Sequence, residues 1–363
     1  MTALPSGALP WWTWAWPLLA WIVLAAVAYF GAHWFVTALA GLVLIATVFA
    51  AVHHAEVVAH RVGEPFGTLV LAIAVTVIEV ALIVSIMVGT ATPDVASLAR
   101  DTVFAAVMIA CNGVVGLCLL VGGARHGEQG FQVAGASAAF AVLGALTVLS
   151  LVMPNFTLST PGPIFNTAQL VFAGVVSLVL YGSFVFVQTI RHRDYFLPPP
   201  GTVAVDHAPP PSVRTTLASF ALLLVSLVAV VGLAKALTPT LDAAVDWLKA
   251  PKAVVGIVIA MLVLLPEGMA AVKAARANQL QTSLNLALGS ALASIGLTIP
   301  AVAAVSIVLG QRLELGLGLK EEVMLALTLF LGVVTLGTGR TTVLQGIVHL
   351  VMFAAFLFLA VVP

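Results

Sequence analysis

Two glutamates lie inside long apolar stretches, where a charged side chain is costly. Glu79 has only apolar or hydroxyl-bearing neighbours from Gly67 to Val88, and Glu267 ends an apolar stretch that begins at Ala253. An ionised carboxylate at the centre of a membrane costs at least about 2.5–3.5 kcal/mol. Such a group is kept where it faces a cavity, a partner or a substrate. We therefore expect both glutamates to be functional, the structural alternative being a protonated carboxyl in a helix–helix hydrogen bond.

The polar side chains around these glutamates are oxygen donors. They are a hydroxyl one helical turn before Glu79, and an amide and two hydroxyls in the apolar stretches that follow the two glutamates: Thr76, Asn112, Ser290 and Ser294. Gly113 and Gly289 lie beside them, so close helix packing is the alternative reason for these small residues. Pro266 has no N–H to offer to the carbonyl of Leu262. Either the helix is broken there and this oxygen lines a cavity, or the proline is a plain kink.

Two carboxylates with neutral oxygens suit a hard cation. Ca²⁺ takes 6–8 oxygen ligands, and Na⁺ is the alternative. No cysteine pair or histidine group lies at this depth, which disfavours a soft metal. Without the cation the two carboxylates would repel each other in a poorly hydrated site, so we expect protons to replace the metal and the pair to titrate as a unit. Glu79 and Glu267 are therefore also the predicted proton-coupling residues.

Composition indicates the protein class. The chain has 363 residues, of which 62% are hydrophobic and 8% charged, with fourteen basic and fourteen acidic residues. A soluble domain has about 25% charged residues, so the sequence predicts an all-α polytopic membrane protein of about eleven spans at about 20 residues each. The balanced charge and the lack of a basic cluster exclude nucleic-acid binding. Cys111 and Cys118 lie seven residues apart in one stretch and are too distant on a helix to form a disulfide.

The span pattern predicts an internal duplication. The expected spans are 14–31, 33–52, 67–90, 98–122, 131–152, 166–190, 215–236, 252–274, 282–309, 320–338 and 342–361. A Pro-rich loop at 192–214 separates an N-terminal helix (1–32) and a five-helix repeat (33–191) from a second five-helix repeat (215–363). An odd number of spans per repeat makes the second repeat inverted in the membrane. Glu79 and Glu267 then occupy the second span of their repeats, and inversion would bring them together at the midplane.

Other charged residues have weaker claims. Asp101 lies on the helix face of Asn112, about 16 Å away along the axis; it could guide ions inward, or pair with Arg100 or Arg125. Glu64 is expected at a helix start, with part of an ion entry as the alternative. His53, His54, Glu56 and His60 form a cluster without the HExxH motif of a metalloprotease. We interpret this cluster as an interfacial helix with solvated histidines.

Two long motifs carry a family resemblance. The sequence resembles bacterial ChaA-type calcium/proton antiporters, which belong to the calcium/cation antiporter superfamily. The first signature repeat of that family is matched by HHAEVVAHRVGEPFGTLVLAIAVTVIEVALI with RDTVFAAVMIACNGVVGLCLLVGG. The second is matched by ARANQLQTSLNLALGSALASIGLTIP, which follows LLPEG. The resemblance implies an ion-coupled exchanger with an inverted five-plus-five core. It also implies that the paired acidic residues are Glu79 and Glu267 and the polar positions Asn112 and Ser290. Vacuolar-type exchangers have Gly-Asn-Ala-x-Glu where this chain has TVIE and LLPE, which bears on ion selectivity.

The predicted function is export of Ca²⁺ in exchange for H⁺, with no cofactor. The alternatives are a Na⁺(K⁺)/H⁺ antiporter of the same fold and a passive cation channel; no nucleophile or cofactor motif supports a membrane enzyme. The expected partners are cations, protons and the lipid bilayer, and the sequence leaves the oligomeric state open. The expected location is the bacterial inner membrane. Eight of the fourteen Lys and Arg residues lie on the side of the N-terminus, which favours a cytoplasmic N-terminus.

Overall fold

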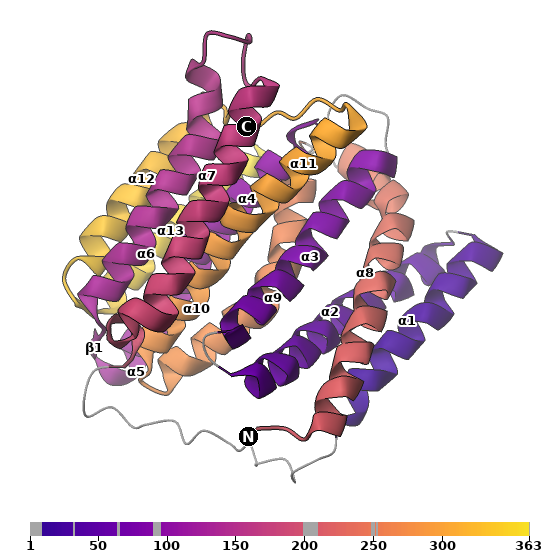
Figure 1. Cartoon of the computed structure of the whole chain (residues 1–363), viewed down its shortest axis with the longest axis horizontal. Helices are drawn as coiled ribbons and strands as arrows, with labels where there is room; N and C mark the ends of the chain where they lie inside the picture. Colours follow the sequence, from indigo (N-terminus) through magenta and orange to yellow (C-terminus); the bar gives the residue numbers. More distant parts are fainter. Residues whose placement is uncertain are drawn as a thin grey trace. The chain divides into compact units, whose positions relative to one another are not determined.

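The chain folds almost entirely into helices (Figure 1). The computed structural model describes residues 9–31, 33–63, 66–89, 96–198, 210–247, 251 and 253–362. Within these ranges the strands are two short ones, β1 (Gln129–Gly130) and β2 (Arg340–Thr341), which pair antiparallel. Residues 199–209 of the Pro-rich loop and Glu64 lie outside the described residues.

Among the described residues, eleven continuous helical segments correspond to the eleven expected spans. In the first half they are α1 (Trp11–Phe30), α2 (Trp34–Val62), α3 (Phe66–Gly89), α4–η2–α5 (Leu98–Met108, Ile109–Val114, Val115–His126), α6–η3–η4 (Val133–Thr147, Val148–Val152, Met153–Phe156) and α7–η5 (Thr167–Phe186, Val187–Arg191). A short 3₁₀ turn, η6 (Arg193–Phe196), follows. In the second half they are α8 (Val213–Trp247), α9 (Ala253–Arg276), α10–η7–α11 (Leu280–Ala293, Ser294–Thr298, Ile299–Leu309), α12 (Leu319–Leu336) and α13 (Val343–Val361).

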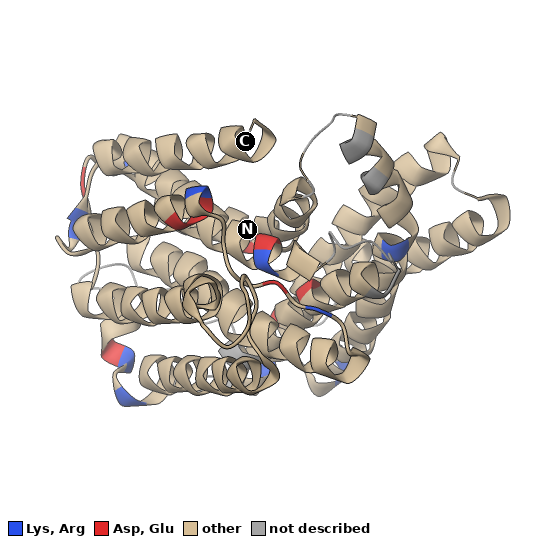
Figure 2. Cartoon of the chain, turned by 90° about the horizontal axis from the view of Figure 1, so that it is seen from above, with Lys and Arg blue, Asp and Glu red and all other residues tan. Residues whose placement is uncertain are grey.

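These helices have the length and surface of membrane spans. Within the described residues, ten of the eleven are long and apolar enough to cross a membrane. The exception, α12, begins with three charged residues, Lys320, Glu321 and Glu322. Large apolar side chains such as Phe172, Val175 and Val179 of α7 are exposed, and charged residues are scarce along the helices (Figure 2). A surface of this kind is stable against lipid rather than water, so the protein is an integral membrane protein.

The described helices form two compact units. Unit 1 lies within Met1–Ala91 and Val205–Lys249 and contains α1, α2, α3 and α8; unit 2 lies within Thr92–Ala204 and Ala250–Pro363 and contains the other helices. In unit 1, α2 packs along both α1 and α8, and α3 packs against α2 and α8. In unit 2, α9 packs against α4, α5 and α10, while α5 also packs against α13. Each unit therefore combines segments from both sides of the Pro-rich loop.

In the described part of unit 2, four π-helical segments lie within or at the end of the spans. They are η2, η3, η5 and η7, and two of them occupy comparable places: η2 interrupts the span after α3, and η7 the span after α9. A π-helical turn bonds i to i+5 and changes the direction of the side chains that follow, and such turns are frequent at functional sites. The expected interruption at Asn112 and Gly113 lies inside η2. The second interruption lies at Ser294–Thr298, because α10 continues regularly through Gly289 and Ser290.

Pro266 does not break its helix. The segment α9 is continuous from Ala253 to Arg276 with the proline inside it, so the broken helix considered from the sequence is wrong. A helix can contain a proline when its neighbours hold the turn in place, and here α4, α5 and α10 pack around α9. The proline still has no N–H, so the carbonyl of Leu262 lacks its usual intrahelical donor.

Candidate functional site

Glu79 lies in the middle of α3, within unit 1. The α3 helix forms because residues 66–89 are a continuous apolar stretch without an internal proline. Glu79 is 2% exposed and Thr76, one turn earlier, is 7% exposed. Both side chains are therefore removed from bulk solvent, although neither residue type favours an apolar environment. The helix spacing places the hydroxyl and the carboxylate on one side of α3.

Glu267 lies in α9, within unit 2, and is also buried at 9% exposure. The neighbouring Gly268 lies against η2, since a Cβ on this glycine would be 3.2 Å from Val114 Cγ2. One turn later, Ala271 and Ala275 pack with Cys118 of α5 in a fully buried apolar cluster. The part of α9 that carries Glu267 is thus fixed by close packing of small residues against η2 and α5.

Asn112 is fully buried in η2 and is held by two other helices. Its Nδ2 donates to Thr328 Oγ1 of α12 at 2.9 Å, and its Oδ1 lies 3.1 Å from Nδ1 of His349 in α13. The other ring nitrogen of His349 lies 3.1 Å from Thr335 Oγ1 of α12. The sequence interpretation noted Asn112 but gave no role to His349, Thr328 or Thr335. The sequence feature that could have identified His349 is its position as a histidine in the middle of the apolar stretch 343–361.

Ser290, Ser294 and Thr298 follow Glu267 at four-residue spacing, but they do not all lie in one regular helix. Ser290 is in α10, and the other two are in η7. Ser290 is half-buried in α10, whereas Ser294 and Thr298, at the two ends of η7, are 3% and 0% exposed. The four-residue spacing aligns hydroxyls only along a regular α-helix, and η7 changes that register. Gly296 in the same segment lies against Tyr181 of α7, where a Cβ would be 2.7 Å from Tyr181 Cβ. The small residues of η7 therefore serve packing as well.

Asp101 forms an ion pair at the beginning of α4. Arg100 Nε donates to Asp101 Oδ1 at 2.8 Å, and Ser97 Oγ donates to Oδ2 at 2.9 Å. Of the two pairings considered, the structure contains the one with Arg100. Asp101 also lines a cavity of about 340 Å³ together with Lys320, Glu321 and apolar residues of α9 and α13. The carboxylate is thus half of a neutralised pair that borders open space.

Two residues of the histidine cluster of α2, His53 and His54, are packed against α1. His54 is fully buried and its Nε2 lies 2.9 Å from the carbonyl oxygen of Thr13 in α1, while the ring of His53 lies 5.2 Å from that of Trp12. Only Glu56 and His60 of the cluster are exposed. The expectation of solvated histidines is therefore wrong for His54. The helix continues to Val62, ten residues beyond the expected end, and α1 covers this part of it.

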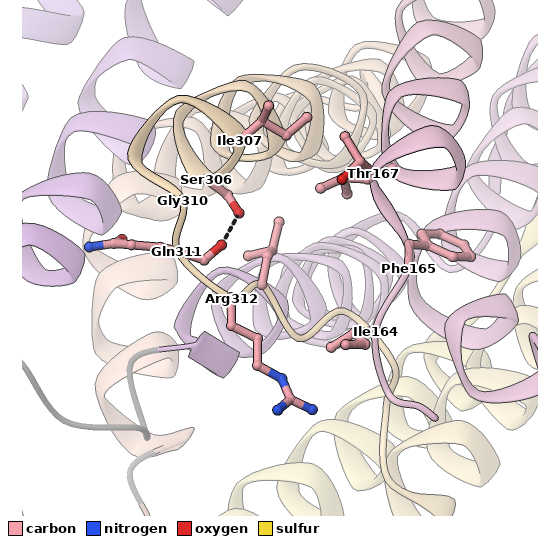
Figure 3. Close-up of a pocket in the computed structure, with 10 residues that line it drawn as sticks. Ile164, Phe165, Thr167, Ser306, Ile307, Gly310, Gln311 and Arg312 are labelled. Atoms are coloured by element: carbon pink, nitrogen blue, oxygen red, sulfur yellow. Dashed lines mark hydrogen bonds between the residues drawn. The ribbon is translucent and has the colours of Figure 1, made fainter. Parts of the chain in front are cut away.

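A second cavity of unit 2, of about 260 Å³, lies between the end of α11 and the segment before α7 (Figure 3). Ser306 Oγ donates to the carbonyl oxygen of Gln311 at 2.7 Å and closes the turn on one side. Arg312 extends its guanidinium away from this bond, as Figure 3 shows. None of the residues singled out from the sequence lines this cavity, so we assign it no part in the candidate site.

The candidate residues differ in their ligand types from a permanently bound metal centre. No group of three or more His, Cys, Asp or Glu side chains that could hold a metal lies together in the described part of the chain. The candidate oxygen donors are instead two buried carboxylates and a hydroxyl on the uninterrupted α3 and α9, and an amide and hydroxyls on the spans that contain η2 and η7. Oxygen donors of this kind are suited to weak, reversible binding of a hard cation.

Apolar spans that carry buried carboxylates define the class of membrane ion transporters. The profile of the sodium/calcium exchanger protein family matches residues 30–190 and 218–362. The chain belongs to this family of cation exchangers; it is a transporter and not an enzyme, and cations are its transported substrates.

Curated relatives and solved structures agree with this assignment. The chain is 54% identical to the putative ionic transporter y4hA of Sinorhizobium fredii, over 99% of this chain and 98% of the relative. It is 36% identical to the sodium-potassium/proton antiporter ChaA of Escherichia coli, over 86% and 85% of the two chains. The fold is similar to that of native YfkE (TM-score 0.74, 16% identity, 97% of this chain and 100% of the other). It is also similar to that of the H⁺/Ca²⁺ exchanger CAX (TM-score 0.71, 13% identity, 95% and 86%). The resemblance to calcium/cation antiporters is thereby confirmed.

Proposed function

We propose that this chain exports Ca²⁺ in exchange for H⁺ through a site to which Glu79 and Glu267 each contribute a carboxylate. One observation supports this most directly. Each of the two glutamates is buried in an apolar span, and in both cases the next span along the chain is interrupted by a π-helical segment. A matched pair of this kind is expected of two inverted five-helix repeats, at 33–191 and 215–363, which place the transport site at their interface.

The site chemistry follows from the donor set. The two carboxylates neutralise a divalent cation, and Thr76, Asn112 and Ser290 supply neutral oxygens. The Asn112 oxygen has a second lone pair beside the one used by His349. When the cation leaves, protonation of the carboxylates removes their mutual repulsion. Cation and protons therefore compete for the same oxygens, and alternating exposure of the site to the two sides turns this competition into exchange.

The other proposals concern the path of the ions to the site and the orientation of the protein in the membrane. Asp101, Ser294 and Glu64 are proposed to line the ion path; the cavity beside Asp101 supports its part. We place the protein in a bacterial inner membrane with a cytoplasmic N-terminus, as the distribution of Lys and Arg favours. Export then requires protons to enter the cell as Ca²⁺ leaves.

A cation panel on everted membrane vesicles tests this function. A preset pH gradient is challenged in turn with Ca²⁺, Na⁺, K⁺, Mg²⁺ and Mn²⁺, and collapse of the gradient is recorded with a fluorescent pH probe. We expect Ca²⁺ to collapse the gradient in vesicles with the wild-type chain and not in vesicles with the Glu79→Gln, Glu267→Gln double variant. Ca²⁺ flux that is electrogenic and independent of protons would instead indicate a passive channel.

A Na⁺(K⁺)/H⁺ antiporter is the second candidate. It is favoured by the 36% identical relative, which is named a sodium-potassium/proton antiporter. The same panel separates the two candidates, because Na⁺ or K⁺ would then collapse the gradient at lower concentration than Ca²⁺. Both candidates use the same carboxylates, so the double variant is the control for each.

A further inference from the structure

His349 lies in the middle of α13 and is 1% exposed, yet it is not among the groups that bind or exchange ions in the proposed function. It is the centre of a buried hydrogen-bonded chain. Nδ1 contacts Asn112 Oδ1 and Nε2 contacts Thr335 Oγ1, each at 3.1 Å. Asn112 Nδ2 continues the chain to Thr328 at 2.9 Å. These bonds join η2 to α12 and α13, which lie more than 200 positions further along the chain.

With the Asn112 amide oriented as in the structure, the bonds fit one arrangement of a neutral imidazole. An amide oxygen only accepts, so Nδ1 of His349 carries the proton and donates to Asn112. Nε2 then accepts from the hydroxyl of Thr335, which can turn to donate. The partners of the ring, which include the backbone of Cys111, are all uncharged, and a buried charge without a charged partner is costly. The arrangement therefore fits a histidine that stays neutral and fixes the direction of the Asn112 amide.

The bonds hold η2 from the side of α13, while α9 contacts η2 from another side. Gly116, one turn after Asn112, lies against His349, where a Cβ would be 3.0 Å from His349 Cβ. Val114 lies against Gly268, the residue after Glu267. The π-helical segment is thus fixed between the histidine and the stretch of α9 that carries the glutamate, all within unit 2. A shift of η2 would be transmitted to Glu267 through this close packing.

We propose that His349 is a positioning residue for cation binding: through its hydrogen bond to Asn112 it fixes η2, and with it the oxygen donors beside Glu267. The inference rests on the proposed function, because it assumes that Glu267 and Asn112 take part in cation binding. The role is one of hydrogen bonding and not of proton transfer. A neutral side chain with one donor and one acceptor should therefore replace the imidazole.

The test compares His349→Leu with His349→Gln. Leucine removes the hydrogen bonds of the ring to Asn112 Oδ1 and Thr335 Oγ1, while the bond from Asn112 Nδ2 to Thr328 stays. The glutamine amide can donate to Asn112 and accept from Thr335 but cannot take up a proton. Cation-driven collapse of a pH gradient is measured over a range of Ca²⁺, Na⁺ and K⁺ concentrations and over a range of pH. We expect His349→Leu to raise the KM for the transported cation about tenfold with a smaller change in maximal rate. His349→Gln should return the KM to within about threefold of wild type, with the wild-type pH profile.

Two further variants control for folding. His54→Leu removes a comparably buried histidine that contacts a backbone carbonyl of α1, and we expect it to leave the KM unchanged. If His349→Leu does not give folded protein, judged by a monodisperse elution profile in detergent, Thr335→Val removes only the partner of Nε2. This variant should raise the KM in the same direction, and Thr335→Ser should restore it.

The results also separate this inference from the function on which it rests. A well-folded His349→Leu protein with the wild-type KM would show that the bonds only stabilise the fold, and would overturn the inference. A His349→Gln protein that is folded and as defective as His349→Leu, or that has a shifted pH profile, would overturn it in favour of proton transfer. Retained exchange in Glu79→Gln or Glu267→Gln would overturn the proposed site itself, whatever the histidine variants show.

Discussion

The two glutamate-bearing helices have the same plan but different surroundings. In α3, Glu79 has the buried hydroxyl of Thr76 one turn before it, and the helix has no proline. In α9, Glu267 directly follows Pro266, which leaves the carbonyl of Leu262 without its usual donor. A neutral oxygen is thus available beside each carboxylate. In α3 it is the side-chain hydroxyl of Thr76, and in α9 it is the backbone carbonyl of Leu262.

The π-helical segments that follow differ in the same way. In η2, Asn112 is bonded to a histidine and a threonine of two other helices. In η7 the polar groups are hydroxyls, and the segment packs through Gly296 against Tyr181. In η2 the hydrogen bonds fix an amide, and in η7 a close contact fixes the backbone at Gly296. The spans that follow the two glutamates thus both contain a π-helical segment, but they differ in what packs against it.

Removing either carboxylate charge should have the largest effect. We expect Glu79→Gln and Glu267→Gln each to lower exchange at least about a hundredfold, because a neutral amide cannot balance the charge of the cation or exchange a proton. Gradient collapse in everted vesicles is the measurement, and Glu56→Gln, at an exposed glutamate of α2, is the control. Retained exchange in either variant would contradict a site built from both carboxylates.

Adding a methyl group to η2 or to η7 should show which of the two segments is packed more tightly. In Gly296→Ala the new Cβ would lie 2.7 Å from Tyr181 Cβ, whereas in Gly113→Ala it would lie 3.3 Å from the ring of Phe353, which can move. We expect Gly296→Ala to lower the free energy of unfolding by about 1–3 kcal/mol and Gly113→Ala by less than about 1 kcal/mol. Thermal unfolding in detergent measures the order. Gly289→Ala, where nothing lies within 4 Å, is the matched control and should be neutral or stabilising.

The two neutral oxygens beside the glutamates can be compared directly. Thr76→Val removes the hydroxyl in α3, and Pro266→Ala supplies an N–H that can bond the Leu262 carbonyl in α9. We expect each variant to raise the KM for the cation about tenfold, the cost of losing one oxygen ligand. Thr76→Ser, which keeps the hydroxyl, should remain near wild type. An unchanged KM in Pro266→Ala would mean that Pro266 only bends the helix and that the Leu262 carbonyl is not a ligand.

The smallest effect is expected from the serines after Glu267. Ser290 is half-buried, as a ligand that faces an accessible space should be, while Ser294 is 3% exposed at the start of η7. We expect Ser290→Ala to raise the KM about threefold and Ser294→Ala less than twofold, since a hydroxyl ligand contributes only about as much as one neutral hydrogen bond. Cation titrations of gradient collapse give both values. The reverse order would assign the ligand role to Ser294.

Some features were predictable because they depend on the membrane alone. Charged residues are so rare in the stretches 67–88 and 253–272 that both must be membrane helices, and Glu79 and Glu267, the one charged residue in each stretch, stand out without any tertiary knowledge. Gly113 beside Asn112 also marked the position of η2. The shift of the second interruption to Ser294–Thr298 was not predictable, because a π-helical turn depends on the contacts of the whole segment. Gly296 packed against Tyr181 is one of those contacts.

By itself the sequence determined the class of protein, the number of spans and the two acids, since hydropathy acts along each helix independently of its neighbours. Only the tertiary structure decided what surrounds them. His349 meets Asn112 across 237 positions in the chain, His54 is covered by α1 rather than by water, and α9 stays continuous through Pro266. These outcomes depend on which helix faces are brought together, and a hydropathy pattern identifies apolar faces but not their partners.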